Sequence, residues 1–417
     1  MIPNYLQTEF EKIINRSYFS KKIRPIREKA FNSLMIDGLP QKKSESWRFT
    51  DLSSIKNGHF SISDKNDAPK KFIKLPKYGF ESFKTIVIYN GHYQEDISSL
   101  PDGIELLSNI DYMEKHSLNA KQPYMSSFDL LNTAFMDSGM SLIIRKKEKV
   151  STPLRLLFIY SGSNNIMVSP RIHLDLEHSS SLFLLEQHVG NCDEYLYNGS
   201  MIVNIEEGAK LEHVRIQNNS KKTINISNHH IQQKQQSIYR FNQIAFGSSL
   251  GRVNLHANLI GQGADCSLNG LSLSSGKQHL DSNITINHQA SYCKSSQDFR
   301  FILKDRSSGV FNGRAIVQEG AEKTDSNQSN KNLLLSEHAL MNSNPQLEIH
   351  NDDVKCSHGS TTGSLDNDAL FYLRSRGIKK DDAIGILVRG FASKKVDSIK
   401  NDEIQTYVNE HFDKWLN

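Results

Sequence analysis

The chain has 417 residues, a formal net charge of +4 and a hydrophobic content of 37%. This charge is too small to require nucleic acid as a partner, and no run of about 18 apolar residues predicts a membrane span. A low hydrophobic content at this length favours an elongated solenoid, which has more surface per residue than a compact enzyme.

The four cysteines are far apart and form no CxxC pair. A disulfide framework or a structural zinc ribbon is therefore not expected, and reduced thiols are typical of a cytosolic protein. The N-terminal segment carries acidic and polar side chains where a signal peptide needs an apolar core. We therefore expect a cytoplasmic protein.

Residues 1–140 predict a mixed, mainly helical cap. Apolar side chains recur at helical spacing near its start. Residues 84–91 run from β-branched side chains into Asn-Gly, a pattern typical of a strand that ends in a turn. Residues 128–135 predict a short helix closed by Gly139.

Residues 141–364 predict the core of the protein. Short apolar or alternating runs recur there, separated by Gly, Asn, Ser and Asp. Similar turns of small residues begin at Ser179, Gly208, Gly263 and Gly320, spaced by one or two multiples of about 28 residues. A β-helix, in which strands stack rung upon rung, explains this mainly β pattern best. A jelly roll is the alternative, because the repeat is degenerate.

The segment 354–359 (VKCSHG) alternates like a strand, which places Cys356 and His358 on one face, roughly 6–7 Å apart along the backbone. A thiolate beside an imidazole can bind iron or a similar metal. Val354 shares this face, so the three side chains could equally line a buried core. Two ligands do not complete a metal site, so further ligands must come from distant residues or from a partner.

Residues 365–417 predict three helices. Asp366 can cap the first, and Gly377 is well placed to end it in a left-handed conformation. A second helix begins at Asp381 or Asp382, and a third follows it. Apolar stripes on such helices are most often core, but a helical appendage on a solenoid can also bind another protein.

Motifs of a self-contained enzyme are missing. Residues 270–278 have one residue too many between their glycines for an ATP-binding loop, and residues 261–263 lack the third glycine of a dinucleotide site. His229 and His230 would point to opposite faces of a strand. The last rung of a β-helix, by contrast, exposes unpaired backbone groups that invite another strand. A ligand pair beside such an edge suits a site shared between two subunits.

A dense set of segments resembles the SufB/SufD family of iron–sulfur cluster assembly scaffolds. Weaker similarity lies in residues 45–50 (ESWRFT) and in 279–281 with His288. The segments that carry the resemblance are 311–313 (FNG), 321–328 (AEKTDSNQ), 332–336 (NLLLS), 345–349 (PQLEI), 352–359 (DDVKCSHG) and 370–378 (LFYLRSRGI).

The resemblance implies a right-handed parallel β-helix with helical N- and C-terminal regions. The lack of an N-terminal cysteine cluster, and the residues 298–300 followed by 309–313, are most similar to SufD members. Such a protein is expected to be a non-catalytic scaffold without an ATP site. It is expected to pair with SufB through β-helix edges and with the SufC ATPase through C-terminal helices.

The resemblance also implies roles for particular residues. His358 matches a histidine implicated at the SufB–SufD interface, where iron entry or nascent cluster assembly is proposed, and Cys356 is its neighbour in the same motif. A flavin in the complex and a homodimer of this chain alone are left open by the sequence. The residues that match the SufC-binding region are Phe371, Tyr372, Leu373, Arg374, Ser375, Arg376, Gly377, Ile378, Ala383, Leu387 and Phe391.

Two other functions compete with this one. A β-helix could act as a purely structural adaptor without metal chemistry. A polysaccharide-processing β-helix enzyme is a weaker alternative, which would use Asp352, Asp353 and Lys355, but aspartates in this setting more often form turns.

Overall fold

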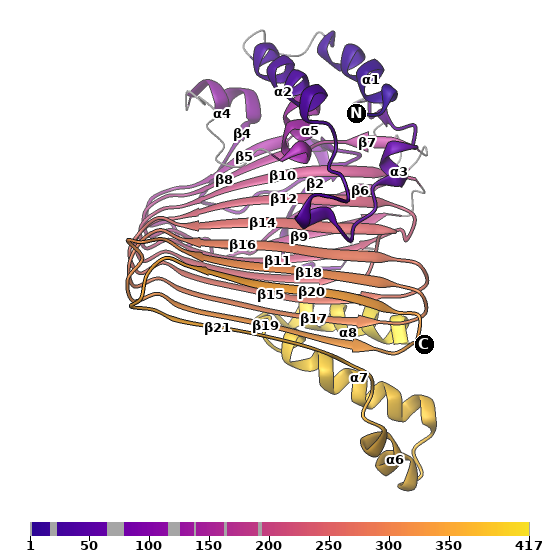
Figure 1. Ribbon diagram of the computed structural model, residues 1–417. Coiled ribbons are helices and arrows are strands. Elements are labelled where there is room, and N and C mark those ends of the chain that lie inside the picture. Colours follow the sequence, from indigo (N-terminus) through magenta and orange to yellow (C-terminus); the bar gives the residue numbers. More distant parts are fainter. Residues whose placement is uncertain are drawn as a thin grey trace.

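The computed structural model describes residues 2–16, 23–64, 79–115, 126–136, 139–161, 165–190 and 194–416. Its body is a column of parallel strands stacked into two long sheets that face each other, with helices at both ends of the chain (Figure 1). The predicted β-helix with helical terminal regions is therefore confirmed, and the jelly roll is excluded because neighbouring long strands run parallel.

Each turn of the column, here called a rung, contributes one strand to each of the two sheets, which are called sheet A and sheet B. The strands of sheet A are β4 (Ile104–Ser108), β5 (Gly139–Ile144), β8 (Arg171–Leu176), β10 (Leu196–Ile205), β12 (Ile224–Gln233), β14 (Leu250–Leu259), β16 (His279–His288), β18 (Ser308–Val317) and β20 (Leu340–Ile349), with β7 (Ile166–Val168) and β1 (Ser61–Ile62) beside them. The strands of sheet B are β3 (His92–Tyr93), β2 (Lys84–Tyr89), β6 (Leu154–Tyr160), β9 (Ser181–Gly190), β11 (Lys210–Asn219), β13 (Ile238–Ala245), β15 (Asp265–Ser274), β17 (Lys294–Leu303), β19 (Asp325–Leu334) and β21 (Lys355–Gly363).

The sequence repeat equals one full turn of this column. Lys210 pairs with Ile238, 28 positions later, and Asp325 pairs with Lys355, 30 positions later. At one corner each turn has a residue of positive φ, which favours glycine and explains the small residues seen there. The amide N–H of that residue donates to a carbonyl of the next turn, as Gly208 does to Gln235 at 2.9 Å. At the turn that begins near Gly320, this conformation falls on Lys323 instead, at φ 57°.

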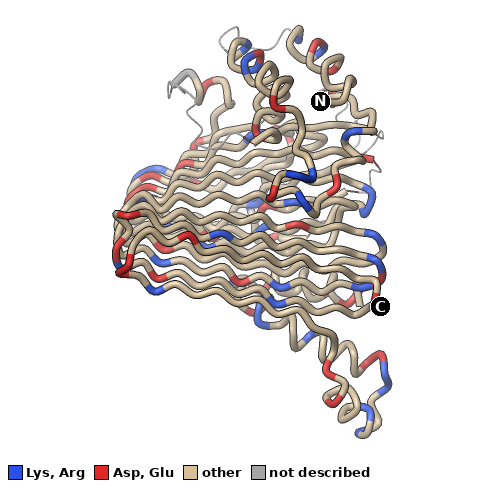
Figure 2. The backbone as a smooth tube through the Cα atoms, in the orientation of Figure 1, with Lys and Arg blue, Asp and Glu red and all other residues tan. Residues whose placement is uncertain are grey.

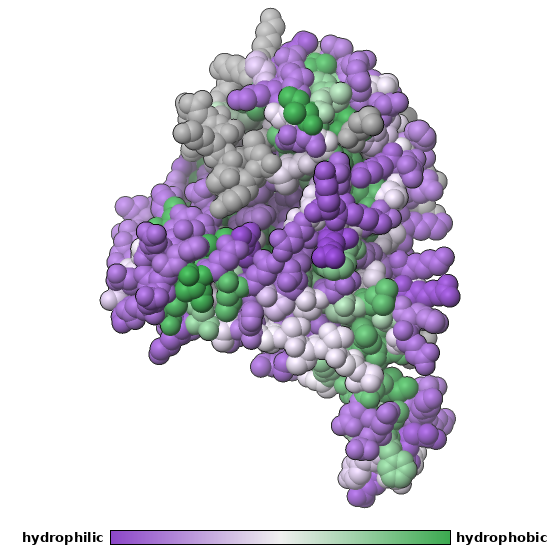
Figure 3. All heavy atoms as spheres, viewed as in Figure 1, coloured by the Kyte–Doolittle hydropathy of each residue, from purple (hydrophilic) through white to green (hydrophobic). Residues whose placement is uncertain are grey.

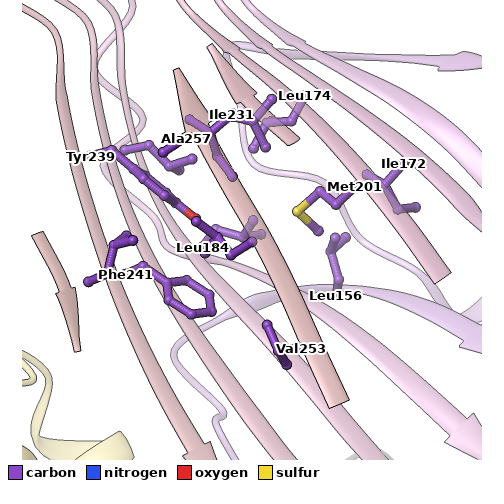
Figure 4. Packing of buried hydrophobic residues seen from close by; sticks show 14 of the residues in the cluster. Leu156, Ile172, Leu174, Leu184, Met201, Ile231, Tyr239, Phe241, Val253 and Ala257 are labelled. Carbon is purple, nitrogen blue, oxygen red and sulfur yellow. The ribbon is translucent and has the colours of Figure 1, made fainter. Parts of the chain in front are cut away.

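Every second side chain of each long strand points between the two sheets and forms the core (Figure 4). Leu184, Tyr239 and Phe241 of sheet B meet Met201 and Val253 of sheet A there. Charged side chains are most frequent at the turns along the two edges of the column (Figure 2). This division follows the strand period of two, which alternates core and solvent positions.

A buried ionic cluster interrupts the apolar core. One carboxylate oxygen of Glu186 lies 2.5 Å from Nε2 of His188 and 3.1 Å from Nε of Arg215. The other lies 3.2 Å from Nε2 of His213 and 3.3 Å from Nε2 of His229. Burial would raise the pKa of Glu186, but His229 and Arg215 hold it well below its ordinary value. The cluster is a carboxylate–guanidinium pair surrounded by imidazoles, which satisfies the charge that burial would otherwise penalise.

The N-terminal helices cover the outer face of sheet A near the first rungs. Phe10 and Phe31 stack with centroids 4.0 Å apart, and the cluster continues into Met167 and Leu196 of the sheet. The predicted cap is thus present, although β2 and β4 lie within residues 1–140 and already extend the two sheets. The helical segments here are α1 (Asn4–Ile14), α2 (Arg24–Asp37), η1 (Glu45–Trp47), α3 (Ser53–Lys56), η4 (Glu95–Ile97), α4 (Asn109–Lys115) and α5 (Ser127–Phe135).

The C-terminal helices differ from one another in what they contact. They are α6 (Asn367–Ser375), α7 (Lys380–Val396) and α8 (Asp402–Leu416). Ile404, Val408 and Phe412 of α8 are buried in a cluster with the outer face of sheet B. In contrast, α6 projects from the end of the column (Figure 1). Within the described residues, no helix combines the length and apolar composition that crossing a bilayer requires.

The column ends abruptly at β20 and β21. Each of these strands pairs with a neighbour on one side only, because the next rung does not exist. Cys356 lies in register with the buried Ser326, and His358 with the buried Gln328. Both therefore occupy core-facing positions on a rung that nothing covers.

The buried histidines predict a loss of stability in acid. Burial lowers the pKa of His288 from 6.5 to about 4. Between these values the unfolded chain binds a proton that the folded chain does not, so the contribution of His288 is fully present above pH 6.5 and is lost as the pH falls. Urea unfolding at about pH 7 and at about pH 5 gives the free energy of unfolding that each protein loses between the two pH values. This loss should be about 2 kcal/mol smaller in His288→Gln than in the wild type. Equal losses in both proteins would contradict this, and the exposed His338→Gln is the control.

The open end predicts unequal thiol reactivity. Cys266 and Cys293 are buried, whereas Cys356 is partly exposed on the last rung. Cys192 lies outside the described residues, so the test uses a Cys192→Ser background. There, a chromogenic disulfide reagent should modify Cys356 in the native protein and the other two thiols only after unfolding. Native modification that persists in Cys356→Ser would show that the open end is not the reactive place.

Candidate functional site

The candidate site is the uncovered face of the last rung. Strand β21 forms because its backbone extends the hydrogen-bonded ladder of β19, from Lys355 opposite Asp325 to Gly363 opposite Leu333. On its other side the N–H and C=O groups of β21 have no paired strand. His358 is exposed and Cys356 is half-buried on this strand.

Both sequence interpretations of the Cys–His pair are reconciled by this position. Cys356 and His358 do share the core-facing parity, as the core interpretation required, whereas Val354 lies just before the strand begins. The core has ended, however, so the side chains remain accessible instead of being sealed. Only their place at the end of the column makes these core positions available to another molecule.

Core-facing side chains of β20 complete the open face. They follow the register of the buried β18 residues, so Met341, Pro345, Leu347 and Ile349 also lie on the uncovered rung. Ile349 is 43% exposed, which is unusual for a core-facing isoleucine. Ser343 Oγ lies 2.7 Å from Ser360 Oγ and links the two edge strands across the opening. The face is therefore mainly apolar, with the thiol and the imidazole along one side.

The electrostatic setting keeps the thiol neutral. Burial and, to a lesser degree, Asp325 raise the pKa of Cys356, while a hydrogen bond from the Ser326 backbone partly opposes them. The thiol is thus no activated nucleophile in the free chain. A bound metal ion would lower its pKa, because a thiolate is the form that coordinates metals.

Cys356 and His358 do not form a closed metal centre with other described residues. Among the residues that the structure describes, no group of three or more Cys, His, Asp or Glu side chains is arranged to hold a metal ion. The buried Glu186 cluster is no exception.

Helices α6 and α7 together are called the arm. The predicted caps of its first helix, α6, are confirmed. The Asp366 carboxylate accepts hydrogen bonds from the backbone N–H of Asp368 at 2.9 Å and of Ala369 at 3.2 Å. Gly377 has φ +88°, the left-handed conformation expected after a helix. These two residues fix the length and direction of α6.

The predicted partner-binding residues differ in their exposure. Phe371 and Tyr372 are 74% and 56% exposed on α6, and apolar side chains gather on this arm (Figure 3). Ala383, in contrast, is fully buried in the first turn of α7. The remaining exposed candidates are Arg374, Ser375, Arg376 and Gly377, and the half-buried ones are Leu373, Ile378, Leu387 and Phe391.

Phe391 belongs to the attachment of α7 to the column. Its carbonyl oxygen accepts a hydrogen bond from Arg300, whose guanidinium lies 5.3 Å from the Phe391 ring centroid. One turn further on, the ammonium of Lys395 lies 2.5 Å from the Asp298 carboxylate. The arm is thus anchored to β17 through residues 298–300, which the sequence had only marked as family-like.

Two weaker motifs of the sequence, residues 45–50 and 279–281, contact each other on the outer face of sheet A. The ring of Trp47 lies 3.7 Å from the guanidinium of Arg252, which also pairs with Asp281. Thr50 Oγ1 donates to the Asp281 carboxylate at 2.5 Å and lies 3.0 Å from Nε2 of His279. The N-terminal segment is held on the outer face of sheet A by these contacts.

Sequence reasoning missed some residues of both surfaces. Ile386 of α7 is 47% exposed beside the predicted arm residues. The core-facing row of β20 was also missed, although the alternation of residues 341–349 could have revealed it. The prediction that His229 and His230 face opposite sides is confirmed, since they contact Glu186 and Asp129 respectively.

Comparison with known proteins agrees with this architecture. The family model described as the SufBD core domain of SUF system FeS cluster assembly matches residues 158–391, and that of the SufBD N-terminal region matches residues 4–156. An iron-sulfur cluster assembly SufBD family protein of Synechocystis is 30% identical over 393 residues, which cover 88% of this chain and 85% of the relative. The iron-sulfur cluster assembly protein SufD of Escherichia coli is 26% identical over 391 residues, 93% of this chain and 92% of its own. Since the core model alone spans more than half of the sequence, the chain belongs to the SufBD family of iron–sulfur cluster assembly proteins.

Proposed function

We propose that this chain is a non-catalytic scaffold subunit of a SUF complex, most like SufD, which pairs with SufB through the open end of its β-helix. The observation that carries the proposal is the uncovered last rung, where His358 and Cys356 lie among exposed apolar side chains. A second β-helix would supply both a strand edge and an apolar core face of matching spacing.

The contact that the second β-helix would make with β20 and β21 is called the seam. Iron or a nascent cluster is the cargo of this seam. His358 would contribute one imidazole, and Cys356 a thiol that loses its proton on binding. Since this chain offers two such groups at the seam, SufB would supply the remaining ligands. Backbone pairing does not depend on side-chain identity, so a second copy of this chain could cover the same edge when SufB is absent.

The arm is the proposed contact for the SufC ATPase. Phe371 and Tyr372 are large aromatic side chains held in solvent on a capped helix, the kind of residue that dominates binding energy at interfaces. Ile386 continues this surface onto α7. Anchoring by Arg300 and Lys395 would let a force on the arm reach the rungs next to the seam.

A structural adaptor without metal chemistry is the alternative. The apolar row of β20 supports pairing with another β-helix even if no metal binds there. Iron titration of the reconstituted complex separates the two functions, because the adaptor predicts no iron bound at the seam.

The role of His358 can be tested by His358→Ala in the complex. Because the change removes an exposed side chain, SufB and SufC should still co-purify, while the yield of reconstituted cluster should fall at least about tenfold. The measurement is the visible absorbance of the cluster after anaerobic reconstitution. Ser357→Ala, whose side chain faces outward on the same strand, is the matched control. A normal cluster yield from His358→Ala would remove the ligand role.

The role of the arm can be tested by Phe371→Ser combined with Tyr372→Ser. Each aromatic truncation should weaken SufC binding by about 2 kcal/mol, or roughly thirtyfold, if these residues are interface anchors. Calorimetric titration with purified SufC measures this loss. Ile36→Ser, at an 85% exposed position on α2, is the control.

Deleting residues 365–417 would not test SufC binding by the arm alone. It would remove α8 together with the arm and uncover the apolar outer face of sheet B, so the column itself would lose stability. Unchanged SufC affinity in the double variant would place the ATPase contact elsewhere.

A further inference from the structure

Two glutamines form a column directly behind His358. His358 is in register with Gln328 of β19, and Gln328 is in register with Gln297 of β17. Gln328 is 2% exposed and Gln297 is 1% exposed. The three side chains therefore share one line of core-facing positions that runs from the open end into the column.

Each glutamine spans the core in the same way. Nε2 of Gln297 donates to the backbone carbonyl of Arg314 on β18 at 3.3 Å, and Nε2 of Gln328 donates to that of Gln346 on β20 at 3.4 Å. The amide nitrogens thus point toward sheet A. In the described part of the chain, Oε1 of each glutamine is buried and accepts no hydrogen bond.

A buried amide oxygen without a donor is unfavourable, so a nearby donor that turns toward it is favoured. For Gln328 that donor is on the next rung, about 4.7–4.9 Å away along the stack, where the imidazole of His358 can present an N–H. For Gln297 the next rung is occupied by Gln328 itself. Only the outer glutamine is adjacent to a group that could bind cargo.

We propose that Gln328 is a positioning residue for His358. When a partner covers the last rung, Oε1 of Gln328 accepts the N–H of one imidazole nitrogen. This fixes the tautomer and leaves the unprotonated nitrogen directed to the seam as the metal ligand. The inference rests on the proposed role of His358 at that seam.

The test compares tautomers in the iron-free complex with SufB. Only this chain carries ¹⁵N-labelled histidine, and the His358 signal is assigned by its loss in His358→Gln. Solid-state ¹⁵N spectra should show one tautomer for the wild type and a mixture for Gln328→Leu, which keeps the volume but has no acceptor. Gln328→Glu retains an acceptor oxygen and should keep a single tautomer. Gln297→Leu removes the same group one rung deeper and should resemble the wild type.

Iron(II) titration of the same complexes gives a second readout. Affinity should fall about 10–100-fold in Gln328→Leu and remain unchanged in Gln297→Leu. Gln328→Met replaces the leucine variant if thermal unfolding shows that leucine disturbs the fold. A wild-type tautomer in Gln328→Leu, or an equal change in Gln297→Leu, would overturn the inference.

The two proposals fail in different ways. Normal cluster yield from His358→Ala would remove the ligand role of His358, whatever the tautomer spectra show. A lost yield in His358→Ala together with unaltered Gln328→Leu spectra would remove only the role of Gln328.

Discussion

Backbone hydrogen bonding between successive rungs is the interaction on which the rest of this molecule depends. Each long strand before β20 is paired on both sides, so the polar backbone of these strands is satisfied by the neighbouring strands. The same regularity creates an unavoidable problem at the end, because the last rung has no neighbour. At the start of the column, short strands and helices cover the first rungs, so little of that edge is left unpaired. At β20 and β21 the described chain offers no such cover, so the core positions of that rung stay exposed.

The interior of the column holds polar as well as apolar side chains. Near the start, Glu186 and Arg215 form a buried ion pair enclosed by imidazoles, which is costly to assemble but fully occupied by hydrogen bonds on the carboxylate. Near the open end, Oε1 of Gln297 and Oε1 of Gln328 are buried without a hydrogen bond. Such atoms are not confined to the open end, since Asn225 Nδ2 and Gln233 Oε1 are also buried without a partner. What distinguishes Gln328 is therefore its place directly behind the uncovered rung.

The C-terminal helices differ in whether they cover an apolar face of the column. Helix α8 is amphipathic and lies on the outer face of sheet B, so it belongs to the column as much as the strands do. Helix α6 has no sheet to lie on, and its aromatic side chains stay in solvent. Between them α7 is fastened at its second half by Lys395 and Arg300. One chain thereby holds two exposed surfaces, the open end of the column and the arm.

The sequence by itself favoured the β-helix over a jelly roll, because both the period of two within strands and the repeat of about 28 residues can be read from the chain, while the parallel pairing that excludes the jelly roll appeared only in the structure. It also determined the caps of α6 and the shared face of Cys356 and His358. Whether that face was sealed or open was decided only by tertiary structure, since parity cannot show that β21 is the last rung. The gathering of Glu186, His213 and His229 was likewise invisible, because neighbours across rungs are far apart in the chain. The sequence specifies which way a side chain points, and the stacking of distant segments specifies what it meets there.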